Sequence, residues 1–515
     1  MKKSLICLFV VVLFVLTNCK KTEPETDECA DDPTACGCPE APVGCGENEN
    51  PAGETISGKV YIAPNGNDNN DGTEARPFKT IQKAADAADP KGLEIILRNG
   101  TYESKEIRFR TSNLTIHSYP GEWAVIKAVI GIEDIASCLW FSEPSIKNVT
   151  LENLEIIGGY YYGLKFESNW DDARSVPFDK RFGVSNVTVK NCRIHDTGRD
   201  CIKITPGCKD IKIINCEIYR SGVGPANVEA QNAEGIDNVN GDNMLVRGCY
   251  FHDIATNGLY AKGGAQNCIF ENNLIVNCGE LGMAAGFLDT DEEWFNLAAN
   301  PNYQESFDII IRNNIVVNAK WGGVGLFAAV GAKVYNNTFV NTGAETFSPL
   351  HISAGEIYTS NAATPKSPPC KDLSIMNNIF IQSAGSDRPM IHLRGMNDNA
   401  APPLAGTNVI DYNIYFKTGK PAVYQNRDVE EMTFAAWKTS TKFDTHSMET
   451  DPKLESNYHL KSGSPAIKAG VVTDIISIDY DGNNRSGKPD IGADEMGEVA
   501  LTTPPASGTT GTGIK

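Results

Sequence analysis

The chain has 515 residues and a formal net charge of −19 at pH 7. A chain this acidic has no excess of cations to neutralise phosphates, so the composition argues against a nucleic-acid partner. If it binds a polyanion, it needs a metal ion or a local basic cluster to do so. A prior of roughly 150 residues per domain divides this length into three domains, but a single solenoid can occupy all of it.

Residues 1–19 have the three regions of an export signal: two lysines, an apolar run over 5–16 and a short polar end before Cys19. The apolar run is shorter than the ~20 residues that a permanent membrane span needs. The Leu-Thr-Asn before Cys19 resembles a lipobox, which implies that Cys19 is acylated and anchors the chain to the outer membrane or cell surface of a Gram-negative bacterium. A cleaved signal with a free Cys19 is the alternative.

Residues 20–55 are rich in Pro, Asp and Glu, which predicts a flexible tether. Four of the 15 cysteines lie there: Cys29, Cys36, Cys38 and Cys45. In an oxidising compartment they favour two local disulfides, with a zinc site as the alternative. The later cysteines fall inside the repeats described next and need not pair.

A strand at 60–62, a helical apolar pattern over 77–88 and a second strand at 94–97 open the folded part of the chain. This order predicts the N-terminal cap of a parallel β-helix, with the helix covering the open end of the first coil.

From 148 to 378 one motif recurs: an alternating strand, an Asn-containing pair and a second short strand. Cys192 and Cys216 are 24 residues apart, and so are Cys249 and Asn273. Longer intervals elsewhere indicate loops inserted into coils of that basal length. The period predicts an all-β fold, a right-handed parallel β-helix over residues 56–496, in which equivalent residues stack at ~4.8 Å.

Residues at the Asn-containing turn are expected to be scaffold. The predicted asparagine ladder consists of Asn191, Asn215, Asn272, Asn313, Asn336 and Asn377, with Cys192, Cys216 and Cys249 stacked beside it. Residues from about 405 to 496 resemble the closing segment of secreted bacterial β-helix proteins, which implies end coils and a cap that hides the last unpaired edge. Residues 497–515 are low-complexity, which predicts disorder.

Function on such a scaffold should lie where charged residues break the repeat on one outer face. Five coils align on the inward residues Leu164, Ile202, Ile236, Leu259 and Met283. Period-two alternation then places Lys165, Lys203, Asp237, Tyr260 and Ala284 outward in one column. The next outward column is Glu167, Thr205, Val239, Lys262 and Gly286.

Three acids, Asp200, Glu234 and Asp237, therefore lie on adjacent coils of one face, with Lys262 one coil further. Clustered carboxylates repel one another unless a cation lies between them, and hard oxygen ligands favour Ca²⁺. A calcium ion beside an amine suits the cleavage of a uronate by β-elimination. The ion stabilises the charge that develops when the C5 proton is removed, and a Lys whose pKa is lowered accepts that proton.

The site segments resemble those of family-nine polysaccharide lyases. The resemblance rests on Asp200, the run Glu234-Gly235-Ile236-Asp237 and the run from Asn257 to Gly264. It implies a calcium site, a Lys base and pectate or related substrates. Glu234 stands where that family has an Asp, Ala233 replaces another carboxylate, Ile236 replaces an aromatic residue, and Lys262 is one residue out of register. A site with one carboxylate fewer would bind calcium weakly, or only with substrate present.

The predicted roles are therefore Lys262 as base, with Asp200, Glu234 and Asp237 as calcium ligands. Lys203, Arg220 and Tyr260 are predicted to contact an acidic polysaccharide, and the protein is expected to be a monomer. Two alternatives stay open: a glycoside hydrolase on the same fold, with paired acids from 237–253 or 289–293, and a non-catalytic glycan-binding lipoprotein.

Three further features of the sequence allow a structural or a functional interpretation. His195 and His252 stand at equivalent places in two coils, which is more typical of turn stacking than of catalysis. Asp242 follows a Gly, as a turn former or an extra ligand would. Trp294, in the insertion that begins near 289, could offer a sugar ring a stacking platform.

Overall fold

The computed structural model describes residues 55–170, 177–360, 363–396, 401–427, 431–473, 475–485 and 487–497. The chain divides into two units, 1–53 and 54–515, and all described residues belong to the second. Cys19, the four tether cysteines and the residues from 498 onward lie outside the described part. Within that part, no helix combines the length and the apolar character that a membrane span requires.

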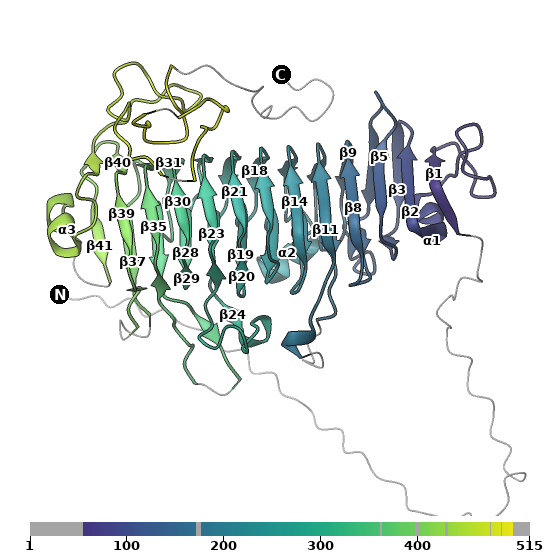
Figure 1. Ribbon diagram of the computed structural model, residues 1–515, viewed down its shortest axis with the longest axis horizontal. Helices are drawn as coiled ribbons and strands as arrows, with labels where there is room; N and C mark the ends of the chain where they lie inside the picture. Colours follow the sequence, from purple (N-terminus) through teal and green to yellow (C-terminus); the bar gives the residue numbers. More distant parts are fainter. Residues whose placement is uncertain are drawn as a thin grey trace, which may run out of the picture. The chain divides into compact units, whose positions relative to one another are not determined.

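The chain from 55 to 449 winds into stacked coils, and each complete coil adds one strand to each of three parallel sheets, as Figure 1 shows. We call them sheets I, II and III in the order in which the chain passes through them. The predicted parallel β-helix is thereby confirmed.

Sheet I has twelve strands: β1 (Ile56–Ile62), β2 (Ala88–Leu97), β5 (Leu114–Ser118), β8 (Lys147–Glu152), β11 (Ser185–Lys190), β14 (Lys209–Ile214), β17 (Leu245–Arg247), β21 (Ile269–Glu271), β26 (Ile310–Arg312), β30 (Lys333–Tyr335), β35 (Ser374–Met376) and β39 (Val409–Asp411). Sheet II also has twelve: β3 (Gly100–Ser104), β6 (Ala124–Ala128), β9 (Leu154–Ile157), β12 (Arg193–His195), β15 (Glu217–Tyr219), β18 (Tyr250–Ile254), β22 (Leu274–Cys278), β27 (Ile315–Val317), β31 (Thr338–Thr342), β36 (Ile379–Gln382), β40 (Ile414–Lys417) and β42 (Met448–Glu449).

Sheet III has eleven strands: β4 (Ile107–Phe109), β7 (Ser137–Phe141), β10 (Tyr162–Phe166), β13 (Ile202–Ile204), β16 (Ile236–Val239), β19 (Leu259–Lys262), β23 (Leu281–Ala285), β28 (Gly322–Phe327), β32 (Leu350–Ser353), β37 (Ile391–Arg394) and β41 (Tyr424–Asn426). Two small sheets lie in the connections. One joins β20 (Ala265–Gln266), β25 (Ser306–Phe307), β29 (Ala329–Val330), β34 (Cys370–Lys371) and β38 (Leu404–Ala405), and the other joins β24 (Thr290–Asp291) and β33 (Ile357–Tyr358).

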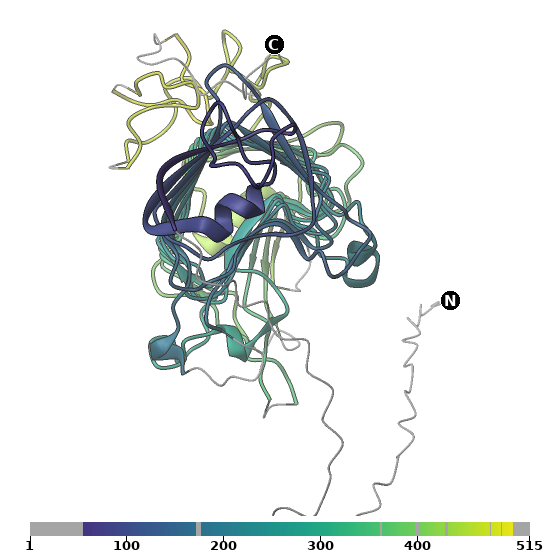
Figure 2. The ribbon, with the colours of Figure 1, turned by 90° about the vertical axis from the view of Figure 1, so that its right-hand side faces the viewer.

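Helix α1 (Ile81–Ala87) is short and begins at Thr80, whose side chain accepts a hydrogen bond from the Lys83 N–H. Figure 2 shows it across the interior at the N-terminal end, where the sequence predicts a capping helix. The remaining helices are α2 (Pro225–Ala230), α3 (Phe434–Thr441) and the single turns η1 (Phe178–Lys180) and η2 (Glu292–Trp294).

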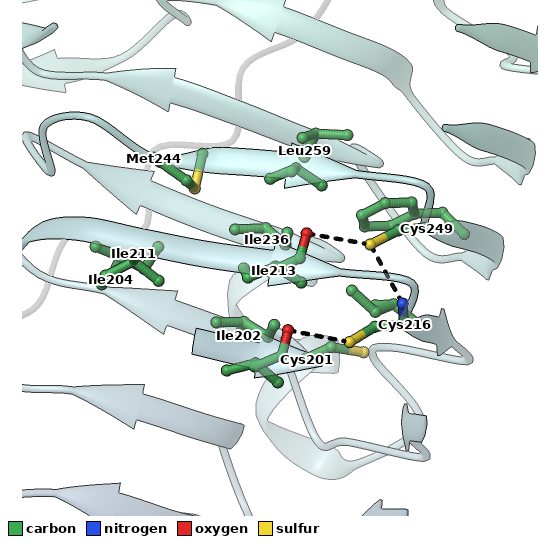
Figure 3. Close-up of a cluster of buried hydrophobic side chains, with 14 of the residues drawn as sticks. Cys201, Ile202, Ile204, Ile211, Ile213, Cys216, Ile236, Met244, Cys249 and Leu259 are labelled. Atoms are coloured by element: carbon green, nitrogen blue, oxygen red, sulfur yellow. Dashed lines mark hydrogen bonds between the residues drawn. The ribbon is translucent and has the colours of Figure 1, made fainter. Parts of the chain in front are cut away.

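The interior is apolar because inward residues of successive coils stack on one another. Ile202, Ile236 and Leu259 are directly paired in sheet III and fully buried, as Figure 3 shows. Burying an aliphatic side chain of this size stabilises the fold by about 1.5–3 kcal/mol. All nine described cysteines are buried and free, in agreement with the prediction that they need not pair.

The buried asparagine ladder is formed mainly by the second residue of each Asn pair, whereas the sequence analysis expects the first; among the first residues, Asn377 donates to Asn336 at 3.3 Å. The amide of Asn314 donates to Asn337, and that of Asn337 to Asn378, with N–O distances of 2.9 and 3.0 Å. In the earlier coils Cys249 holds this position, and its N–H donates to the amide oxygen of Asn273. The first residues of the pairs adopt positive φ, for example +52° at Asn313.

Those first asparagines bind the C-terminal segment, residues 451–497. Asn272, Asn313 and Asn336 donate to the backbone carbonyls of Asp479, Ile478 and Asp490. The segment packs Tyr480 and Ala493 on outward apolar residues of sheet II, and Figure 1 shows it along the side of the late coils, in yellow. The sequence predicts end coils and a cap within about 405–496. In that range β41, the last strand of sheet III, is followed by α3, which packs its buried Trp437 on Tyr424 of that strand, while the segment from 451 covers a lateral face.

Candidate functional site

The predicted outward column on sheet III is present. In the parallel ladder Lys165 pairs with Lys203, Lys203 with Asp237, Asp237 with Tyr260, and Tyr260 with Ala284. Lys262 pairs with Val239 in the neighbouring column, also as predicted. The amine therefore lies on the same wall of the coil as the acids.

Asp200, Glu234 and Asp237 each offer one carboxylate oxygen to a group whose atoms lie within 4.8 Å of one another. Asp200 and Glu234 lie two residues before the first residues of β13 and β16, and Asp237 lies in β16, so stacking of two coils brings them together. Their residues are only 0%, 3% and 1% exposed, whereas the sequence places them on an open outer wall.

Each acid also has an oxygen with no hydrogen-bond partner. Asp200 accepts from the Glu234 N–H at 3.1 Å, Glu234 accepts from the Asn257 amide at 3.2 Å, and Asp237 is paired with Lys203. The other oxygens, Asp200 Oδ2, Glu234 Oε2 and Asp237 Oδ1, are buried and unpartnered. Buried polar atoms are normally satisfied, so three orphaned oxygens from one cluster fit a hard divalent cation.

The electrostatics follow from this crowding. Burial and the neighbouring carboxylates raise the pKa of Asp200 and of Glu234 above their usual values. Burial alone would raise the pKa of Asp237 as well, but Lys203 and Lys262 lower it below its usual value. Burial opposes the charge on Lys203, yet Asp237, Tyr162 and Asp200 raise its pKa above normal, so its amine is held protonated.

Lys262 projects toward aromatic rings. Its Nζ lies 5.1 Å from the ring centre of Tyr260 and 5.7 Å from that of Phe287, and these two rings stack on each other. No carboxylate among the described residues lies within salt-bridge distance of this amine. Tyr260 belongs to an aromatic cluster of buried and half-buried side chains, which we call the aromatic patch: Tyr260, Leu281, Ala284, Phe327, Phe347, Phe287, Leu288 and Trp321.

Sequence reasoning missed three ionisable groups around the acids. Arg199 precedes Asp200, and its interaction with all three acids helps to raise its pKa against the effect of burial. Burial and Glu234 raise the pKa of Glu280 to about 8, and its carboxylate accepts from Asn257. Burial raises the pKa of Glu305 to about 7, and its carboxylate accepts from the Gly263 N–H. The sequence shows only that Arg199 is adjacent to Asp200, because Glu280 and Glu305 belong to other coils.

Arg220 lies in the turn after sheet II and not in the acid cluster, and its predicted contact with a polysaccharide stays a prediction. It follows β15 of sheet II and pairs with Asp196 at 2.9 Å. The connection from 220 to 235 is an insertion that includes α2, so the residue at its start remains at the turn after sheet II.

The remaining candidates from the sequence analysis each contact other residues of the fold. His195 and His252 occupy equivalent positions in sheet II, both stacked on Tyr219, and each bonds the Asp that follows it. Asp242 accepts from the Gln266 N–H in a turn. One ring face of Trp294 is covered by Trp170, at 4.3 Å between ring centres.

Comparison with known proteins agrees with the coil architecture. Residues 182–367 match the family model described as right-handed beta helix region, and residues 64–108 match a second model, DUF1565. The fold therefore defines the class: the chain is a right-handed parallel β-helix.

Within that class the chain is similar in sequence to pectate lyase L of Thermoclostridium stercorarium, 28% identical over 313 residues. The alignment covers 54% of this chain and only 22% of that relative. Among solved structures, pectate lyase Pel9A is 16% identical with a TM-score of 0.49, covering 86% of this chain and 97% of that one. The surface adhesin PfbA of Streptococcus pneumoniae is 13% identical with a TM-score of 0.41, covering 67% and 85%.

Proposed function

We propose that this protein is a polysaccharide lyase that cleaves a uronate-containing, pectin-like polysaccharide by β-elimination. The observation on which the proposal depends is the cluster of Asp200, Glu234 and Asp237, with three unpartnered buried oxygens beside Lys203 and Lys262. The similarity to pectate lyase L supports the same class of reaction. Because one fold hosts many functions, the argument rests on the site and not on the coil.

The three carboxylates would hold a Ca²⁺ ion, since calcium prefers carboxylate oxygens. When bound, such an ion supplies positive charge that stabilises the negative charge developing on a uronate carboxylate.

Lys262 is the base in this proposal. It lies near enough to Glu234 and Asp237 to lower the pKa of both carboxyl groups, and no carboxylate among the described residues lies within salt-bridge distance of its amine. Lys203 cannot take that role while it is paired with Asp237, so it would bind a substrate carboxylate together with Arg199. Tyr260, whose pKa burial and the neighbouring acids raise well above normal, stays protonated and would donate a hydrogen bond.

The experiment is incubation of the protein with pectate, rhamnogalacturonan and alginate, with calcium or with a chelator. Calcium-dependent ultraviolet absorbance from unsaturated uronate ends is the expected result. New reducing ends without that absorbance would establish hydrolysis instead, and glycan retained without either product would establish a binding protein. Asp237→Asn should abolish the calcium dependence, whereas Asp253→Asn, an exposed acid on sheet II, serves as the matched control.

We further propose that the protein is exported and anchored through a lipid at Cys19, which brings the site to extracellular glycans. Metabolic labelling with a fatty acid should mark the wild-type chain and leave Cys19→Ala unlabelled. Labelling of both chains would exclude this anchor.

A further inference from the structure

A second set of ionisable side chains lies on sheet III, beyond the aromatic patch. The outward column that contains Asp237 and Tyr260 continues through Ala284 and Gly325 to His351 and then His392. Four rungs separate Asp237 from His351, which at ~4.8 Å per rung is about 19 Å along the coil axis. The two sets therefore lie on one line parallel to that axis.

His351 is buried without a polar partner. The residue is 1% exposed, and its ring stacks on Phe347 at 4.3 Å between ring centres. Neither Nδ1 nor Nε2 has a hydrogen-bond partner among the described residues. An unsatisfied buried polar group costs about 1–3 kcal/mol, so this imidazole is poised for a ligand that can supply the missing bonds.

The surroundings of His351 are cationic. Burial, His392, Arg394 and Arg388 all lower the pKa of His351 well below its usual value, so the ring is neutral and offers one donor and one acceptor nitrogen. Arg394 is half-buried and Arg388 is exposed. No carboxylate among the described residues lies within salt-bridge distance of either guanidinium. In a chain of net charge −19, two arginines without carboxylate partners are a local excess of positive charge. The Arg388 Nε–H donates to the backbone carbonyl of Glu345.

The surface between the two sets is apolar. Phe287, Leu288 and Trp321 are the half-buried members of the aromatic patch. Beneath the patch, the outward column of sheet III continues through Ala284 and Gly325, which have no long side chain. Apolar and aromatic surface with a few placed polar groups is the usual lining of a ligand site. A sugar chain could cross this surface with its charged groups at either end.

We propose that His351, Arg388 and Arg394 form a distal subsite that binds a second uronate unit of the same polysaccharide chain. The inference rests on the proposed function. The guanidinium groups would pair with the uronate carboxylate, for which their planar donor geometry is suited. The neutral His351 ring would exchange hydrogen bonds with a sugar hydroxyl. The protein would then recognise a stretch of polymer that spans four coils, and short acidic oligosaccharides would bind weakly.

The test measures calorimetric binding of a galacturonate trimer and a galacturonate hexamer in the presence of calcium. All proteins contain Lys262→Met, so that the probes are not cleaved. Arg394→Gln and His351→Phe are compared with Arg76→Gln, which removes one exposed charge from the N-terminal loop. Circular dichroism on heating checks that each variant is folded, and His351→Gln provides a second variant should the Phe substitution disturb packing.

Each subsite variant should weaken hexamer binding about tenfold, which corresponds to about 1.4 kcal/mol, and should leave trimer binding unchanged. The control and a neutral glucan hexamer should show no such difference. Hexamer affinity that stays within twofold in folded Arg394→Gln and His351→Phe would overturn the subsite, even if wild-type protein forms unsaturated products. A tenfold loss without unsaturated products from wild type would support the subsite and reject the lyase reaction.

Discussion

Asp237 lies directly opposite Tyr260 in the ladder between β16 and β19, whereas Lys262 lies opposite Val239, two residues further along the strand. The residue opposite Asp237 in the next coil is thus a phenol, and the amine of Lys262 belongs to the adjacent column. The register therefore places Tyr260 and Lys262, the two possible proton acceptors, in different columns, although they are only two residues apart in the sequence.

Lys262→Met should lower the rate of unsaturated product formation by about 10²–10⁴-fold, because general base catalysis contributes in that range. Binding of acidic oligosaccharides should change far less, since Lys203 and Arg199 remain. Tyr260→Phe should retain most of the activity. If Tyr260→Phe loses the activity and Lys262→Met keeps it, the phenol and not the amine is the base.

Glu305→Gln should make the metal-free protein more stable at pH 8 and leave it nearly unchanged at pH 4.5. Burial raises the pKa of Glu305 from 4.5 to about 7 in the folded protein. A group with a raised folded pKa stabilises below its unfolded pKa, and that contribution is lost as the pH rises through the folded value. The shift corresponds to a contribution on the order of 3 kcal/mol.

Thermal unfolding of wild type, Glu305→Gln and the exposed control Glu345→Gln across this pH range checks the expectation. The amide can still accept from the Gly263 N–H. Parallel stability profiles for wild type and Glu305→Gln would show that the carboxyl does not titrate as described.

Asn314→Leu should lower the free energy of unfolding by about 3 kcal/mol or more. The buried Asn314 amide donates to the Phe270 carbonyl and to Asn337, and its oxygen accepts from Asn273. Removing it leaves several buried groups unsatisfied at once. Denaturant unfolding is the measurement. Asn457→Ala, at an exposed position, should change stability by less than about 0.5 kcal/mol, and an equally small effect at 314 would contradict the ladder.

Arg485→Met should release the C-terminal segment from sheet II. The Arg485 side chain is only 2% exposed, pairs with Glu495 at 3.0 Å and donates to the Gly492 and Ala493 carbonyls. Breaking a buried pair by removing one partner costs about 3–5 kcal/mol, because the other charge stays buried. Hydrogen exchange should rise in 451–497 and in the strands beneath it. Protection equal to wild type would show that the ion pair does not hold the segment.

The order of the Asn-containing turns and the alternation in sheet III could be predicted from the sequence because both are local. Period-two alternation decides which face a side chain takes, and the recurrence of about 24 residues decides which residues stack. Those two regularities were sufficient to place Asp237, Tyr260 and Lys262 on one wall. They also predicted that the buried cysteines need not pair.

What the tertiary structure alone decided depends on contacts between distant segments. The burial of the three acids, the arrival of Glu305 from another coil and the position of Arg220 all follow from inserted connections, whose paths no periodicity describes. The C-terminal segment covers sheet II because outward residues such as Val317 and Val340 are apolar and need a partner. The sequence shows those apolar residues, but only the folded chain shows which segment, more than 100 residues away, buries them.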